Sequence, residues 1–110
     1  RERRLCRESE WQAACRGPDG LAYPYGDVFT RGACAVGGGA RAVGTSNGCR
    51  SPVGTYDMSG NAAEWVAEGL LKGGDHASDA FGARCASRSR PGVPPEPTLT
   101  GVRCCSDPAR

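Results

Sequence analysis

The residues with the clearest chemical potential lie in the stretch from Gly54 to Val66, which reads Gly-Thr-Tyr-Asp-Met-Ser-Gly-Asn-Ala-Ala-Glu-Trp-Val. Apolar residues alternate with polar ones up to Met58, which favours a strand. The following Ser-Gly-Asn is typical of a turn, because Gly and Asn tolerate a positive φ. Such a turn aims backbone carbonyls inward, and Glu64 adds a charged oxygen, so the pattern suits a hard cation such as calcium. The simpler interpretation is a hairpin with a surface carboxylate and a buried tryptophan, Trp65.

A second group of polar side chains surrounds the only histidine of the chain, His76. It lies between Asp75 and Ser78 on a loop that also contains Asp79. The two aspartates could form a weak metal or acid–base cluster with the imidazole. A lone histidine on a polar loop is more often simply solvated, and nothing else in the sequence supports the cluster.

Two cysteines, Cys34 and Cys49, bracket a glycine-rich segment without periodicity. The spacing is not that of a Cys-x-x-Cys zinc site. A disulfide between them would close a loop of about 15 residues and contribute about 3 kcal/mol on the chain-entropy model. We therefore expect these two cysteines to form a disulfide.

Short elements are expected to position these groups. Residues 5–15 are predicted to form a helix that buries Trp11, Ala14 and Cys15 on one face. Acidic residues occupy its first turn, where the helix dipole favours them. No side chain in the usual position caps its start, so the cap is lost or Ser9 provides it. Arg16-Gly17-Pro18 is expected to end the helix.

The second half of the chain is predicted to contain short strands at Leu70–Leu71, Arg84–Arg88 and Leu99–Cys105. A proline-rich segment from Pro91 to Pro97 must form a surface loop, because proline cannot continue a strand ladder. These strands contain Arg84, Arg88 and Arg103. We favour a structural role for the three side chains, in which they bond to loop carbonyls, over ligand binding.

The composition excludes several classes of protein. The chain has 110 residues, 17 Gly, 8 Pro and only 6% aromatic residues, so a loop-rich single domain with a thin core is expected. The net charge of +2 is too small to indicate nucleic-acid or membrane-surface binding. No apolar run reaches the length of a membrane span. The 7 Cys indicate an oxidising compartment, and the odd count leaves a thiol that is free or pairs outside the chain.

The stretch Tyr-Asp-Met-x-Gly-Asn-x-x-Glu-Trp resembles the signature of the formylglycine-generating enzyme family, also called the sulfatase-modifying-factor domain. Other segments resemble further motifs of this family in the same order along the chain. These segments are Arg4–Trp11, Tyr23–Asp27, Lys72–Gly74, Arg84–Arg88 and Thr100–Cys104. The resemblance implies an α+β, C-type-lectin-like fold, loop-rich, with little regular secondary structure and braced by disulfides. It also implies that residues 1–110 are the C-terminal portion of such a domain, whose N-terminal portion is absent from this chain.

The resemblance also bears on the remaining cysteines. It implies that Cys15 pairs with Cys85. Cys6 replaces a proline of the family and Cys105 follows its closing cysteine, which suggests that these two additional cysteines pair with each other. Cys104 corresponds to the closing cysteine, whose partner in the family lies upstream. We expect Cys104 to bond to the missing N-terminal half or to another chain, although Cys104 and Cys105 could exchange roles.

For the metal site, the resemblance implies a structural calcium ion on the central turn. Its expected ligands are the carbonyl groups of Ser59, Gly60 and Ala62 and the side-chain oxygens of Glu64 and Asn61. Copper is not expected, because the family holds it with two thiolates in the segment before the position of Cys85. No cysteine lies between Cys49 and Cys85.

The sequence leaves two functional hypotheses, which belong to different classes of protein. The first is a non-catalytic binding domain, secreted, periplasmic or on a cell surface, as in family members with variable ligand-binding loops, including retroelement-diversified proteins. Its expected ligand loop consists of Asp75, His76, Ser78, Asp79 and Phe81. The second is an oxidoreductase, either a copper-dependent formylglycine-generating enzyme or a sulfoxide-forming relative. The missing cysteine pair favours the binding domain.

Overall fold

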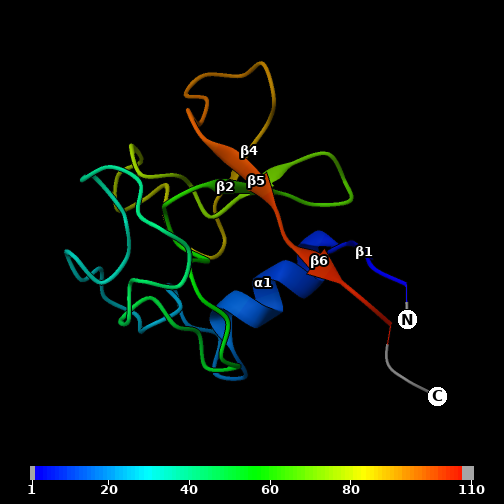
Figure 1. The fold of residues 1–110 in the computed structure, drawn as a ribbon, viewed down its shortest axis with the longest axis horizontal. Helices are drawn as coiled ribbons and strands as arrows, with labels where there is room; N and C mark the ends of the chain where they lie inside the picture. Colours follow the sequence, from blue (N-terminus) through cyan, green and yellow to red (C-terminus); the bar gives the residue numbers. More distant parts are fainter. Residues whose placement is uncertain (1, 108–110) are drawn as a thin grey trace.

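A computed structural model describes residues 2–107 of the chain, and Figure 1 shows their arrangement. The helix α1 (Glu8–Arg16) lies between the sheet of β2, β4 and β5 above it and the lower loops in the view of Figure 1, and most of the long loops lie on the left. The strands are β1 (Arg4–Leu5), β2 (Ala63–Trp65), β3 (Leu71–Lys72), β4 (Arg88–Ser89), β5 (Thr100–Val102) and β6 (Cys104–Cys105). The predicted α+β, loop-rich and disulfide-braced fold is confirmed.

The strands form two small sheets. One has the order β4-β3-β2-β5, in which β2 pairs antiparallel with β3 and parallel with β5. The other joins β1 to β6 in antiparallel register. Strands from the two ends of the described chain therefore lie side by side near α1 (Figure 1).

The helix forms much as its sequence predicts, but begins later. Arg7 is extended and precedes the helix, and its backbone N–H donates to the Glu10 carboxylate at 2.8 Å. Glu10 rather than Ser9 thus satisfies the free backbone group at this end. Gly17, at a φ of 70°, ends the helix and donates to the carbonyl of Ala13. Trp11 and Cys15 are buried as predicted.

The predicted strand up to Met58 is wrong. Its only ladder contact is an isolated bridge between Arg50 and Tyr56. Asp57 has a φ of 61°, which is incompatible with an extended strand. The strand of this region, β2, instead follows the Ser-Gly-Asn turn and includes Glu64.

Other predicted strands are shortened or divided. Residues 84–87 form turns, and only Arg88 and Ser89 pair with β3. The segment 99–105 is interrupted at Arg103, so that β5 and β6 join different sheets. The predicted strand at Leu70–Leu71 is found one residue later, as β3.

Three disulfides hold the loops, in the pairs expected from the sequence: Cys6–Cys105, Cys15–Cys85 and Cys34–Cys49. The first two lie in the main core cluster with Trp11, Met58 and Val66. Cys104 is exposed and forms no disulfide within the described residues. The disulfides compensate for a core with few large side chains.

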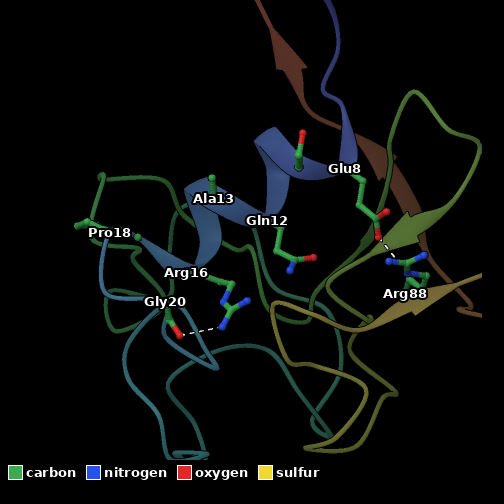
Figure 2. A pocket seen from close by; sticks show the side chains of 9 residues that line it. Glu8, Gln12, Ala13, Arg16, Pro18, Gly20 and Arg88 are labelled. Carbon is green, nitrogen blue, oxygen red and sulfur yellow. Dashed lines mark hydrogen bonds and ion pairs between the residues drawn. The ribbon is translucent and has the colours of Figure 1, made fainter.

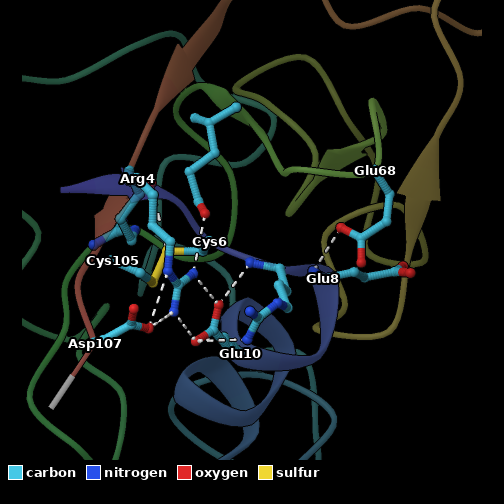
Figure 3. A network of polar contacts seen from close by, with 10 residues as sticks. Arg4, Cys6, Glu8, Glu10, Glu68, Cys105 and Asp107 are labelled. Carbon is cyan, nitrogen blue, oxygen red and sulfur yellow. Dashed lines mark hydrogen bonds and ion pairs between the residues drawn. A yellow bond between two sulfur atoms is a disulfide. The ribbon is translucent and has the colours of Figure 1, made fainter. Parts of the chain in front are cut away.

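A polar network braces the two ends of the described chain (Figure 3). The Arg4 guanidinium donates to both oxygens of Glu10 at 2.7 Å and to the Asp107 carboxylate at 3.0 Å. Hydrogen bonds from Arg4 and from the backbone of Arg7 lower the pKa of Glu10 to about 2. The network joins α1 to the residues that follow β6, next to the Cys6–Cys105 disulfide.

The low pKa of Glu10 predicts a pH dependence of stability. The carboxylate has an ordinary pKa of 4.5, so its network stabilises the fold fully above that value. This contribution is lost as the pH falls toward about 2. We expect the urea midpoint of Glu10→Gln to change less between pH 5 and pH 2 than that of the wild type. Glu96→Gln, which removes an exposed carboxylate, should keep the wild-type profile; identical profiles for all three would contradict the prediction.

The geometry of the Ser59–Asn61 turn predicts that position 60 strongly requires glycine. Gly60 has a φ of 76°, and an added Cβ would collide with the Ala35 carbonyl and the Val36 side chain. Gly92 has a φ of 80°, but nothing lies within 4 Å of its added Cβ. We expect Gly92→Ala to cost about 1–2 kcal/mol, the penalty of a left-handed residue, and Gly60→Ala to cost clearly more. Urea unfolding monitored by tryptophan fluorescence measures both, and equal losses would refute the steric argument.

Candidate functional site

The carboxylate of Glu64 is the centre of the motif that the sequence singles out. It lies on β2 and is only 8% exposed. Its Oε1 accepts hydrogen bonds from Trp11 Nε1 at 2.8 Å and from Arg103 Nε at 2.7 Å. Its Oε2 accepts from Arg103 Nη2 at 2.9 Å. Both oxygens are therefore used by neighbouring side chains of the chain itself.

Arg103 is the partner that sequence reasoning missed in this role. Burial lowers its pKa, but the hydrogen bonds and charge of Glu64 outweigh burial and raise it. Arg103 Nη2 also donates to the carbonyl of Tyr56 at 2.7 Å, as expected for an arginine that bonds to a loop carbonyl. The bidentate geometry is the strongest that an arginine and a carboxylate can form.

The other expected calcium ligands also take part in the packing of the turn. Asn61 Oδ1 accepts from the backbone N–H of Arg41 at 2.8 Å, and the Asn61 carbonyl accepts from His76 at 3.0 Å. The Ser59 hydroxyl donates to the carbonyl of Ala83 at 2.7 Å. The turn thus holds together segments that are distant in sequence.

The donor set does not fit calcium at Glu64 as the side chains stand. A calcium ion prefers six to eight oxygen ligands, including charged carboxylates. Glu64 is the only carboxylate of the expected set, and binding an ion would require it to exchange Arg103 for the metal. The calcium prediction from the sequence is therefore untested, and the engagement of Glu64 with Arg103 argues against it.

Removing the charge of Glu64 should destabilise the fold strongly. In Glu64→Gln the amide can still accept from Trp11, but the half-buried Arg103 guanidinium loses its counter-charge. We expect the free energy of unfolding to fall by about 2 kcal/mol or more. Glu96→Gln, at an exposed carboxylate without an ion pair or a hydrogen bond among the described residues, should have little effect. Urea unfolding of both variants checks this, and a neutral Glu64→Gln would show that the ion pair contributes nothing.

The same proteins test the calcium prediction. Because Arg103 donates hydrogen bonds to both oxygens of the Glu64 carboxylate, we expect the wild-type melting temperature to be the same in excess calcium and in EDTA. A calcium-dependent rise in the wild type that Glu64→Gln abolishes would show that the carboxylate does bind the ion.

A cavity of about 750 Å³ lies between the ligand loop and the proline-rich loop. One wall is formed by lining residues from the segment 74–82 without His76 and Ala80, and by those from 84–90 without Cys85, and residues 93–97 form the other. In Figure 1 the proline-rich loop projects beyond β4 and β5 as the orange loop. The volume is within the range of small-molecule sites.

Asp75 holds the two walls together. It is 1% exposed, and its Oδ2 accepts from the Thr98 N–H at 2.6 Å, the Thr98 hydroxyl at 2.9 Å and the Leu99 N–H at 3.0 Å. Its Oδ1 accepts from the N–H of Ala77 at 3.0 Å. Burial raises the pKa of Asp75, but these hydrogen bonds outweigh it and lower the pKa overall. Asp75 therefore fixes the end of the proline-rich loop to the ligand loop.

Phe81 and Arg84 stack on each other at this wall. Phe81 is 69% exposed, and the Arg84 guanidinium carbon lies 3.7 Å from the centre of its ring. Arg84 Nε also donates to the Phe81 carbonyl at 3.0 Å. An aromatic ring and a planar cation stacked in this way are attracted to each other. The cavity thus has a preformed aromatic and cationic surface.

The structure brings together most of the ligand loop expected from the sequence. Asp75, Ser78, Asp79 and Phe81 line the cavity. His76 is absent from the lining, and its Nε2 lies 3.3 Å from the Thr98 hydroxyl. Within residues 2–107 no three His, Cys, Asp or Glu side chains gather as metal ligands, so the cluster with His76 does not form.

Sequence reasoning missed the opposite wall and the arginines. The proline-rich loop was expected only at the surface, and a structural role was favoured for Arg84 and Arg88. Both arginines line the cavity, although Arg88 also pairs with Glu8 at 3.0 Å. The sequence offered one local signal of this wall, an apolar residue, Val93, within the proline-rich segment. The structure shows that Val93 is exposed.

A second, shallower pocket of about 570 Å³ follows α1 (Figure 2). Glu8, Gln12 and Arg16 line it from successive turns, but their polar atoms are already used. Arg16 donates to the carbonyls of Gly20 and Leu21, and Glu8 and Gln12 accept from the fully buried Lys72. Burial lowers the pKa of Lys72. These contacts attach α1 to the sheet.

Comparison with known proteins agrees with this architecture. The model of the sulfatase-modifying factor enzyme 1-like domain matches residues 1–108. The chain belongs to this family. The resemblance found in its motifs is thus confirmed over nearly the entire sequence.

The fold is similar to that of Treponema denticola variable protein 1, a solved structure with a TM-score of 0.67 and 22% sequence identity. The similarity covers 83% of this chain and 43% of that protein, so the chain spans less than half the length of this relative. It supports the predicted C-type-lectin-like fold of the family. None of the curated proteins matches the chain.

Proposed function

We propose that this family member is a binding domain, and that the cavity between the ligand loop and the proline-rich loop is its site. The observation that carries the proposal is the pairing of Phe81 and Arg84 on a cavity wall that hydrogen bonds hold in place. An exposed phenylalanine in a concave, preformed surface is characteristic of recognition sites. Four of the cavity's lining residues belong to the ligand loop expected from the sequence.

The chemistry of the lining supports binding over oxidation. Copper chemistry in this family uses thiolates, which are soft ligands for Cu(I). Neither a cysteine nor His76 is among the lining residues. Six of the cysteines form disulfides, and Cys104 lies on β6, outside the lining. Family membership by itself does not establish a catalytic activity.

The disulfides indicate an oxidising compartment, and within residues 2–107 the helix α1 is too short and too polar to cross a bilayer. We propose a secreted, periplasmic or cell-surface location. In such a compartment the exposed Cys104 thiol would be expected to pair. We propose that it bonds to the remaining portion of the domain or to another chain, which mass spectrometry under non-reducing conditions would reveal.

The binding proposal predicts ligands that depend on Phe81. Peptides selected on the immobilised chain from a displayed random library should include a class that loses affinity about tenfold or more for Phe81→Ser, because aromatic contact area dominates such interfaces. Val43→Ser is a matched control, since Val43 is 85% exposed and does not line the cavity. Fluorescence polarisation of the selected peptides measures both variants.

Two results would contradict the proposal. One is a set of peptides that bind both variants like the wild type, which would place recognition elsewhere. The other is conversion of cysteine to formylglycine in a cysteine-containing peptide incubated with the chain, copper and oxygen. Mass spectrometry detects that conversion directly and would favour the oxidoreductase.

A further inference from the structure

Three arginines line the cavity, and two of them, Arg84 and Arg90, have no acidic partner among the described residues, whereas Arg88 pairs with Glu8. Arg84 is fixed by its contacts with the ring and the carbonyl of Phe81, and Arg90 is exposed. Neither guanidinium forms an ion pair with a described carboxylate, although Asp79 and Glu96 line the same cavity. In contrast, Arg103 and Arg4 are fully paired elsewhere in the molecule. The terminal nitrogens of Arg84 are therefore available to a ligand.

We infer that the cavity recognises a peptide segment in which a single acidic side chain lies beside an apolar one. The inference rests on the proposed binding function and specifies its ligand. The carboxylate would bind the free edge of the Arg84 guanidinium, whose planar fork matches two oxygens. Because Phe81 already orients this guanidinium, little side-chain entropy is lost on binding.

The apolar part of the ligand follows from the rest of the lining. Phe81 and Val93 are 69% and 52% exposed, and both line the cavity. Three prolines of the opposite wall, Pro94, Pro95 and Pro97, have no backbone N–H to donate. This wall offers mainly apolar surface to a side chain next to the carboxylate.

The acidic residues of the lining exclude a polyanion. Asp79 accepts from the Gly82 N–H through Oδ1, and both Asp79 and Glu96 are exposed and line the cavity. Both would repel a second and third negative charge on the ligand. A nucleic acid or a sulfated polysaccharide is therefore a poor match, whereas one carboxylate next to an apolar group satisfies the whole lining.

The test uses peptides selected on the wild-type chain from a displayed random library. We expect the Phe81-dependent class to be enriched in Asp or Glu next to an apolar residue. Replacing that acid by its amide should weaken binding about tenfold or more, since a lost charged hydrogen bond has this effect. Arg84→Gln should cause a similar loss, and the two changes should not add.

Matched variants separate the contribution of the Arg84 guanidinium group from that of its charge alone. Arg84→Lys keeps the charge but loses the fork, so affinity should lie between those of the wild type and Arg84→Gln. Arg31→Gln removes an exposed arginine that does not line the cavity and should leave affinity unchanged. Circular dichroism of each variant checks that the fold is retained.

The experiment distinguishes a failure of the carboxylate inference from a failure of the proposed binding function. If selected peptides lose affinity for Phe81→Ser but carry no acid and bind Arg84→Gln normally, the cavity is a binding site and the carboxylate inference is wrong. If no selected peptide responds to Phe81→Ser or Arg84→Gln, the proposed function itself fails. Binding that persists for the amide peptide and vanishes for Arg84→Gln would also overturn the inference, because the arginine would then act through another group.

Discussion

The buried carboxylate of Glu64 is the constraint on which the rest of the structure depends. A charge at 8% exposure must be compensated, and here Trp11 and Arg103 provide the compensation. Trp11 brings in the helix, and Arg103 brings in the C-terminal segment. Because Arg103 turns inward, the extended segment is interrupted, with β5 in one sheet and β6 in the other. One carboxylate thus joins the helix, through Trp11, and the segment between the two sheets, through Arg103.

The turn before Glu64 organises the loops in the same way. Its backbone donates to the carbonyls of Gly73 and Ala35 and accepts from His76. The chain has so little regular structure that such loop-to-loop hydrogen bonds replace the ladders of a larger sheet. Asp75 extends this pattern to the proline-rich loop. The result is a cavity whose irregular walls are nevertheless anchored at several points.

This division between a braced scaffold and an open cavity bears on function. In the family, the segment before the position of Cys85 supplies thiolates for copper, but here it supplies the wall with Phe81 and Arg84. The Cys15–Cys85 disulfide and the hydrogen bonds of Asp75 to Thr98 and Leu99 hold this segment in place. Membership of a fold family does not by itself fix a function, so the side chains that line this cavity are where the function of the chain must be tested.

The sequence, read with the resemblance of its motifs to the family, predicted the family, the fold class, the helix and the disulfide pairs found in the structure. The helix and the Cys34–Cys49 pair followed from local pattern and spacing, whereas the Cys15–Cys85 and Cys6–Cys105 pairs, 70 and 99 residues apart, followed from the resemblance. The sequence also indicated most of the ligand loop. It placed the strand at Tyr56–Met58 wrongly, since alternation of side chains does not reveal the positive φ of Asp57. Only the tertiary structure shows that Glu64 forms an ion pair with Arg103, 39 residues away. It also shows that the proline-rich loop lines the same cavity as Phe81. Both depend on contacts between distant segments, and short motifs carry no information about which distant partner a buried charge or an open loop will meet.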